Sequence, residues 1–216
     1  MEKMTVKKAV EQSGKVSLGN TKMPSTTFAI SAKACKVGAK LAKIENSTCS
    51  RCYALKLQNL RPSVDKGWTN NLLKAEKLIA DNPMLWAKQM KFQIERGCKK
   101  LGVYFHRWFD SGDLQSVEML HAIVLTANRT PQIKHWLPTR EVKIVSDYLK
   151  IYKEFPDNLL VRVSSPMIDG EPLKFDYTST VHHKEKAKGH DCPSRFQENE
   201  CRDCRACWNK NIKNVS

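Results

Sequence analysis

The chain has 216 residues, of which 41% are hydrophobic and 27% are charged, and 37 lysines and arginines against 22 acidic residues give a formal net charge of +15. This composition is typical of a globular protein with one domain and an appendage. No apolar run is long enough to span a membrane and the start lacks the apolar core of a signal peptide, so we expect a cytoplasmic location and no membrane partner. The charge makes nucleic acid a candidate partner, although lysines spread along a chain also describe an ordinary solvated surface.

The N-terminal part of the chain is polar up to its first apolar run. Residues 1–24 carry lysines and are interrupted by glycines and a proline, which predicts a loosely held N-terminal arm. Residues 26–31 are β-branched and aromatic, which predicts a first strand. A cysteine-bearing loop over residues 35–53 follows directly, and residues 36–44 have the apolar spacing of a short helix within it.

Two helices are predicted after this loop. Thr69 or Asn70 can cap the first, which runs towards Asp81 and carries several leucines and an isoleucine. Pro83 suits the first turn of the second helix, which we expect to stop at Gly97.

From residue 101 onwards, strand patterns alternate with helical patterns across short connections. His106 and Arg107 alternate on the first of these strands, so one of the two side chains points to the inner face of the sheet. The predicted order is a strand at 101–108, a helix at 114–128, a strand at 133–137, a helix from 140 to 155, a strand at 159–164 and a further strand at 175–181.

This alternation predicts the fold class. Strands and helices that alternate form right-handed βαβ units and a parallel sheet. Five strands are too few for a closed eight-stranded barrel, so we expect an α/β fold: a partial (β/α) barrel with about five mainly parallel strands over residues 25–181. Residues 182–216 are polar and cysteine-rich, and we expect them to form a small C-terminal module held together by metal.

The cysteines point to metal chemistry. A reducing cytosol disfavours disulfides, so clustered cysteines in a cytoplasmic protein are first of all candidate metal ligands. Cys35, Cys49 and Cys52 lie in the predicted loop, where the C-x-x-C pair lets two thiolates reach one centre. Three thiolates can hold an iron–sulfur cluster and leave one iron open. Cys98 stands alone and is interpreted as a small buried hydrophobic residue.

The C-terminal segment carries the second group of cysteines. Cys192, Cys201, Cys204 and Cys207 include a C-x-x-C-x-x-C run, a pattern found where thiolates surround a cubane iron–sulfur cluster. The same residues suit zinc bound by four cysteines, or by three of them with His190. The sequence therefore predicts a metal site here and leaves iron and zinc both open.

The residues that follow the predicted strands would share one mouth, because active sites of parallel α/β proteins form at the carboxyl ends of their strands. Gly112 allows close backbone approach and Asp113 could hold an ammonium group. Arg140 could donate two parallel hydrogen bonds to a carboxylate, and the hydroxyl of Ser164 could form a hydrogen bond with a ribose. Each also has a plain alternative: Asp113 as a helix N-cap, Arg140 at a solvated helix start, and Ser164 as a turn residue.

Together these features resemble the radical S-adenosylmethionine superfamily, and most of all its small phage-encoded members of the gene product 88 type. The resemblance extends over roughly residues 26–165. It is carried by Cys35, Cys49, Cys52-Tyr53-Ala54, Ser111-Gly112-Asp113 and the segments 136–140 and 158–164.

The resemblance implies a set of roles. Cys35, Cys49 and Cys52 would hold a [4Fe-4S] cluster whose fourth iron binds S-adenosylmethionine. Gly112 and Asp113 would receive the methionine amine, Ser164 would lie near the ribose and Arg140 near the carboxylate; the four tail cysteines would hold a second cluster. The implied activity is reductive cleavage of S-adenosylmethionine to a 5′-deoxyadenosyl radical that acts on an unidentified substrate, with a ferredoxin or flavodoxin as reductant, in the host cytoplasm.

The chain departs from the superfamily pattern in two places. The usual spacing is C-x3-C-x2-C, whereas Cys35 lies ten residues further from Cys49 than this pattern asks. Either the loop carries an insertion, or Cys35 is not a ligand and the cluster recruits a tail cysteine. The acidic motif is Ser-Gly-Asp in place of Gly-Gly-Glu. The alternative function is a non-catalytic, basic phage protein, stapled by an iron–sulfur or zinc centre, that binds nucleic acid.

Overall fold

The computed structural model describes residues 4–20 and 22–216. Its elements, in chain order, are α1 (Val6–Ser13), β1 (Thr26–Phe28), the 3-10 turn η1 (Ala32–Ala34), α2 (Val37–Leu41), α3 (Tyr53–Leu60), α4 (Pro62–Asp81), α5 (Pro83–Leu101), β2 (Phe105–Trp108), α6 (Val117–Asn128), β3 (Lys134–Thr139), α7 (Val142–Tyr152), β4 (Leu159–Ile168), β5 (Thr178–Val181), η2 (Pro193–Phe196), η3 (Ala206–Trp208) and β6 (Asn214–Val215).

The strands form one six-stranded sheet in which every neighbouring pair is parallel and the order follows the chain from β1 to β6. The sheet does not close, because β1 and β6 form its two edges. The predicted partial barrel is therefore confirmed, with six strands where about five were expected. The sixth strand, β6, was missed because it is only two residues long and has no pattern of its own.

One face of the sheet carries the hydrophobic core. Right-handed crossovers that always step in the same direction leave their helices on the same face. Side chains from α4, α5, α6 and α7 pack there against the strands, around Trp86 and Trp108, whose rings lie 5.9 Å apart. Along the part of the chain that the structure describes, no helix is both long and apolar enough to cross a membrane.

His106 and His135 are paired in register and buried on this helix-covered face. Trp108 Nε1 donates to His135 Nδ1 at 3.2 Å, and His135 Nε2 lies 2.8 Å from Thr130 Oγ1, whose own hydroxyl donates to Thr126 O. Nδ1 must therefore be unprotonated, so His135 is held as the neutral Nε2–H form. Burial lowers the pKa of His135 to about 3.

This histidine is expected to make the protein sensitive to acid. Because the unfolded chain binds a proton near pH 6.5 and the folded chain does not, the stabilisation from neutral His135 is complete above that pH and is lost as pH falls towards 3. Replacing His135 with glutamine should reduce the pH dependence of the unfolding free energy by about 1.4 kcal/mol per pH unit below 6.5. Urea unfolding at pH 7, 6 and 5 measures this, and equal slopes for the two proteins would contradict it.

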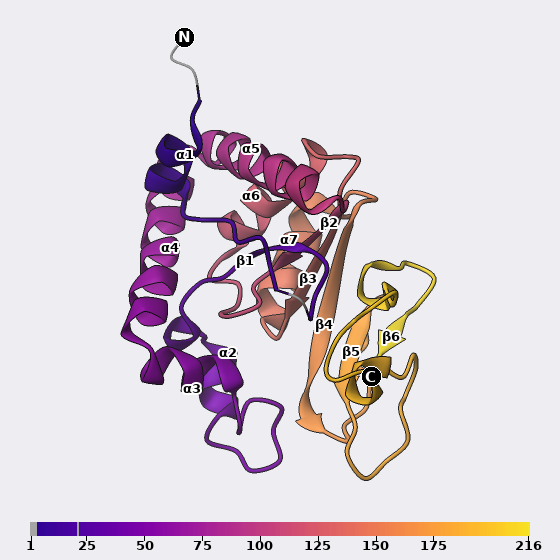
Figure 1. Ribbon diagram of the computed structural model, residues 1–216. Helices are drawn as coiled ribbons and strands as arrows, with labels where there is room; N and C mark the ends of the chain where they lie inside the picture. The colour runs from indigo at the N-terminus through magenta and orange to yellow at the C-terminus, as the bar shows by residue number, and fades with distance from the viewer. Residues whose placement is uncertain (1–3, 21) are drawn as a thin grey trace.

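The other face of the sheet, which we call the inner face, is covered by the C-terminal segment. Arg107 and Trp136, the next residues along β2 and β3, point to this face. Trp208 packs on them, with its ring 5.3 Å from the rings of Phe105 and Trp136, and its Nε1 donates to His106 O at 2.9 Å. Figure 1 shows this segment, in yellow, beside β5 and β6 and away from α1, α4 and α5. It therefore fills space that a closed barrel fills with its own side chains.

The N-terminal arm differs from the prediction. Residues 1–3 and 21 of it lie outside the described residues, but α1 packs against α4 and α5. Ser13 is fully buried, and its carbonyl accepts a hydrogen bond from Trp86 Nε1 at 3.1 Å. The expectation of a loosely held arm was wrong. The glycines and lysines in and around α1 concealed the apolar pattern of a short amphipathic helix.

The helices after the cysteine loop also differ. The helix expected from Thr69 is a 20-residue helix, α4, with Pro62 in its first turn, and it is preceded by an unpredicted helix, α3. Helix α5 continues through Gly97 and ends before Gly102, which is left-handed. Gly97 instead permits close packing, because a Cβ there would lie 2.7 Å from Thr26 Cγ2.

Candidate functional site

A cavity of about 610 Å³ opens where the carboxyl ends of the strands meet the cysteine loop. It contains all seven residues that were predicted from the loop and the strand ends. They are Cys35, Cys49, Cys52, Gly112, Asp113, Arg140 and Ser164, and they are joined in the lining by others including Gly38, Tyr53, Arg107 and Ser111. The shared mouth predicted from the strand ends is therefore present.

The cysteine loop reaches this cavity through two short helices. Most of the residues between Cys35 and Cys49 form α2 and the turns after it. Cys52 caps α3, and its Sγ accepts from the backbone N–H of Leu55 at 3.4 Å. The C-x-x-C pair therefore ends at a helix N-terminus, where the helix dipole favours negative charge.

The thiols lie in an environment that disfavours free thiolates. The pKa of Cys35 is raised to about 12, mainly by burial and then by the charges of Asp113, Cys52 and Cys49. Burial also raises the pKa of Cys49, an effect that Arg140 partly opposes. The thiols can become thiolates together only if a cation compensates them, as a bound metal does.

Gly38 keeps the space between two of the thiols open. A Cβ at this position would lie 3.6 Å from Cys49 Sγ and 3.7 Å from Cys35 Sγ. The nearest atom would be Cys35 Cβ at 3.2 Å, a tight contact that alanine meets with a small shift of its neighbour, whereas a larger side chain would occupy the space that both sulfur atoms face. The signal in the sequence was a glycine inside a helix, which normally destabilises a helix.

We predict that Gly38→Val lowers the iron content of anaerobically prepared protein about tenfold, an effect of the size seen when groups around a metal site are changed. The valine methyl groups would extend from a Cβ that already contacts both sulfur atoms. Iron per chain measures the effect, with Gly38→Ala as the matched control. Full iron content in the valine variant would show that this space is not used.

Asp113 joins two strand ends. Its Oδ1 accepts from Thr139 Oγ1 at 2.6 Å and from Leu114 N at 2.8 Å, and its Oδ2 accepts from Arg140 N at 2.9 Å. Burial raises the pKa of Asp113 to about 6, although these hydrogen bonds act in the opposite direction. The N-cap of α6 is Ser116, so the alternative of Asp113 as that cap was wrong. The carboxylate holds the β2 and β3 loops together at the cavity wall.

Gly112 is required by packing. Its φ is +81°, and a Cβ would lie 2.4 Å from Ile30 Cγ1 and 2.8 Å from Ile30 O. The adjacent carbonyl of Ser111 accepts from Ile30 N at 3.0 Å. The glycine therefore lets the β2 loop lie directly on the chain that leaves β1, next to the cysteine loop.

Arg140 and Ser164 complete the predicted set. Arg140 Nε donates to Thr48 Oγ1 at 2.9 Å, so its side chain braces the cysteine loop and does not start a solvated helix. Ser164 Oγ lies 2.8 Å from Ser179 Oγ, on the regular part of β4 before its register shifts, so it is not a turn residue.

Two cavity residues, Arg107 and Ser111, were named in the sequence analysis but given no role in the site. Of the alternating pair on β2, His106 faces the helices, while Arg107 lines the cavity with its guanidinium 4.8 Å above the ring of Trp136. Arg107 Nε and the hydroxyl of Ser111 are buried and have no hydrogen-bond partner among the described residues. Buried polar atoms of this kind are usually satisfied by water or a ligand.

The tail cysteines do not line this cavity; they lie on the C-terminal segment over the inner face. Within residues 4–20 and 22–216, no three histidine, cysteine, aspartate or glutamate side chains stand close enough together to hold a metal ion.

A family model described as Gene product 88 matches residues 2–210. The chain belongs to the Gene product 88 family. This match confirms the phage-protein part of the resemblance seen in the sequence, while the radical S-adenosylmethionine part stays a prediction. A search of curated proteins finds no significant match, and neither does a search of solved structures. The function of this Gene product 88 protein must therefore be argued from its cavity.

Proposed function

We propose that this Gene product 88 protein is an iron–sulfur enzyme of the radical S-adenosylmethionine type, acting in the host cytoplasm. Cys35, Cys49 and Cys52 would hold a [4Fe-4S] cluster, and S-adenosylmethionine would bind beside it in the same cavity. The observation that supports this is the single cavity of about 610 Å³, which contains these three cysteines and the glycine-acid motif at the end of β2.

The donor types in the cavity suit such a group, although among the described residues the side chains as they stand are not gathered closely enough to hold a metal ion. Three thiols of one loop match the number of protein ligands that leave one iron of a cubane cluster open. Gly38 leaves the space between Cys35 and Cys49 free of side-chain atoms. The cavity volume lies within the range of small-molecule sites, and Ser111 offers a buried hydroxyl that lacks a partner.

When bound, the cluster and S-adenosylmethionine would supply reductive cleavage of a sulfonium and a 5′-deoxyadenosyl radical that abstracts hydrogen from a substrate, with electrons from a ferredoxin or flavodoxin. The chain itself would bind and orient these groups and exclude water from the cavity. Asp113 keeps the β2 and β3 loops together, and Arg140 braces the cysteine loop through Thr48. Gly112 brings backbone close to the cavity, and Ser164 offers a hydroxyl near a ribose. The C-terminal segment covers the inner face next to the cavity.

The deciding experiment is anaerobic purification of the full chain, followed by iron and sulfide analysis and an assay for 5′-deoxyadenosine after dithionite reduction. We expect a brown protein that releases 5′-deoxyadenosine only when S-adenosylmethionine and reductant are both present. A colourless protein that retains only zinc would contradict the proposal.

A second candidate function is binding of nucleic acid without catalysis, by a protein whose fold is held together by a bound metal. The observation that favours it is the net charge of +15, together with Lys33, Lys43, Arg107 and Arg140 in the cavity lining. Such binding would weaken steeply with salt, because each phosphate contact releases counterions. Tight, salt-dependent binding of DNA or RNA by protein that holds only zinc would favour this function over catalysis.

A further inference from the structure

The four tail cysteines are anchored from different parts of the fold. Cys192 N donates to Ser216 O at 2.9 Å, beside β6, and Cys201 N donates to Lys22 O at 2.8 Å, ahead of β1. Cys204 N donates to Cys201 O at 2.9 Å within a tight turn. The carbonyl of Cys207 accepts from Arg162 Nε of β4 at 3.1 Å. Residues far apart in the sequence therefore fix the backbones of the four cysteines over the inner face.

The thiols are close enough for their charges to interact. The pKa of Cys201 is raised first by burial and then by the charges of Cys192 and Cys204. The pKa of Cys207 is raised to about 12, first by burial and then by the charge of Cys192, while the charge of Arg162 opposes this. A fifth donor lies at the same place, because Cys204 Sγ is 3.6 Å from His190 Nε2.

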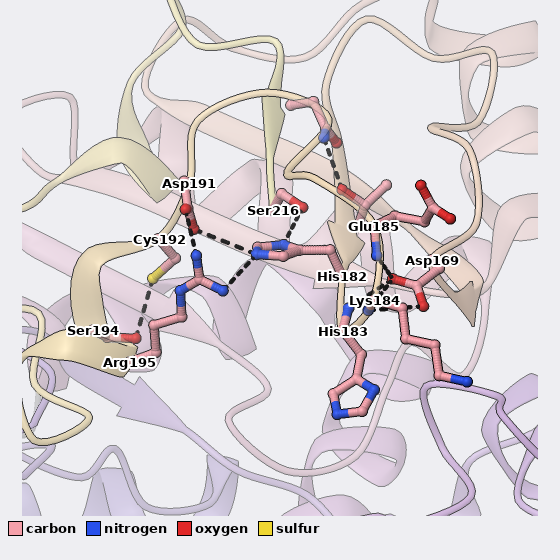
Figure 2. Close-up of polar contacts among 12 residues, drawn as sticks. Asp169, His182, His183, Lys184, Glu185, Asp191, Cys192, Ser194, Arg195 and Ser216 are labelled. Atoms are coloured by element: carbon pink, nitrogen blue, oxygen red, sulfur yellow. Dashed lines mark hydrogen bonds and ion pairs between the residues drawn. The ribbon is translucent and has the colours of Figure 1, made fainter.

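A polar network fastens the start of this segment, as Figure 2 shows. His182, just after β5, points to Ser216 Oγ with its Nδ1 at 2.8 Å, and Arg195 Nη1 donates to its Nε2 at 2.8 Å. Because arginine only donates, Nε2 is the acceptor and Nδ1–H donates to Ser216. Arg195 also donates to Asp191 Oδ2 at 2.7 Å, one residue before Cys192. This network holds the Cys192 end against the last strand.

The backbone between Cys192 and Cys204 is strained. Glu198, Asn199 and Arg202 have φ values of 57°, 63° and 42°, although none of them is glycine. Residues other than glycine persist in the left-handed region where the surroundings over-determine the chain, as they do at ligand clamps. All three residues lie between Cys192 and Cys204.

Arg162 is a buried cation next to these thiols. It is 0% exposed, and its guanidinium donates to six backbone carbonyls, five of which belong to the C-terminal segment: Ala206, Cys207, Asn209, Ile212 and Lys213, with Thr178 as the sixth. No carboxylate of the described residues is among these partners. Six carbonyl dipoles solvate the guanidinium, and an anion nearby would stabilise the buried positive charge further.

We propose that Cys192, Cys201, Cys204 and Cys207 form a thiolate metal centre that is separate from the loop cavity, with Arg162 as the positioning residue that compensates its negative charge and docks it on the inner face. As they stand, the thiols do not form a single-ion site, so they must turn about their Cα–Cβ bonds when metal binds. Four thiolates give the centre a negative charge, which supplies the anion that Arg162 lacks.

The first experiment separates this centre from the loop. The full chain is reconstituted anaerobically with zinc alone or with ferrous iron and sulfide, and metal per chain is measured with the absorption spectrum. We expect Cys204→Ser to remove one thiolate-bound centre while Cys49→Ser leaves it in place, and the two reconstitutions tell zinc from an iron–sulfur cluster. Cys98→Ser is the matched control, since Cys98 is an isolated buried thiol. Metal content unaffected by Cys204→Ser would overturn this proposal but not the proposed function.

The second experiment tests Arg162. We expect Arg162→Met to lower the affinity of the tail for metal about tenfold or more and to shift the charge-transfer band of the bound metal, and Arg162→Lys to restore most of the affinity because it keeps the charge. Equal affinities and spectra in all three proteins would overturn its role. If Arg162→Met does not fold, hydrogen exchange of residues 190–216 in the wild type, with and without a chelator, replaces it. Protection lost on chelation supports the proposal, and unchanged protection overturns it.

Discussion

Replacing Cys49 with serine is expected to lower the iron content of the loop cavity about tenfold or more, a loss at least as large as that caused by changes around a metal site. Cys49 is buried, faces the space beside Gly38 and feels the charge of Arg140. A serine hydroxyl ionises far less readily than a thiol and is a poor ligand for iron, so two thiols would remain where three are needed. Iron and sulfide per chain after anaerobic reconstitution measure the change.

Cys98→Ser is the control for this experiment. Cys98 is 2% exposed and lies in α5, 3.6 Å from Thr26 Oγ1, so its replacement removes a buried thiol without touching the cavity. We expect its iron content to equal that of the wild type. Equal losses in both variants would mean that iron is bound without specificity, and full iron in Cys49→Ser would exclude Cys49 as a ligand.

The second large effect is expected for Gly112→Ala, which should destabilise the fold by about 3 kcal/mol. The alanine would adopt a φ of +81° and its Cβ would meet the backbone carbonyl of Ile30 at 2.8 Å, so strain and overpacking add together. For a chain of this size, that loss corresponds to a fall in the melting temperature of roughly 6–12 °C. Thermal and urea unfolding measure it.

Gly67→Ala is the matched control. Gly67 lies inside α4, and a Cβ there would have nothing within 4 Å. Alanine should therefore stabilise the helix by about 0.5–1 kcal/mol. An unchanged melting temperature in Gly112→Ala would show that the β2 loop can move away from Ile30, and the tight glycine contact would then not be needed to shape the cavity.

Much of the fold could be predicted because its signals are local. The alternation of apolar strands and amphipathic helices after residue 101 indicated βαβ units. Because the crossover between two parallel strands is right-handed, an open parallel sheet was predicted. Boundaries were less accurate. Gly97 looked like a helix end, but it is a packing glycine against Thr26, a contact made between residues far apart in the sequence. Helix α3 was missed, because its leucines mark no buried face: two of them, Leu57 and Leu60, are exposed.

The sequence by itself determined which residues meet at the mouth of the sheet, because the direction of parallel strands places the residues after β1, β2 and β3 at one edge, beside Ser164 of β4. Only the tertiary structure decided what those residues do there. The carboxylate of Asp113 accepts hydrogen bonds from Thr139 and Arg140, and the side chain of Arg107 lines the cavity from the inner face. Arg162 joins β4 to the C-terminal segment. These contacts cross tens of residues, and no local pattern specifies them.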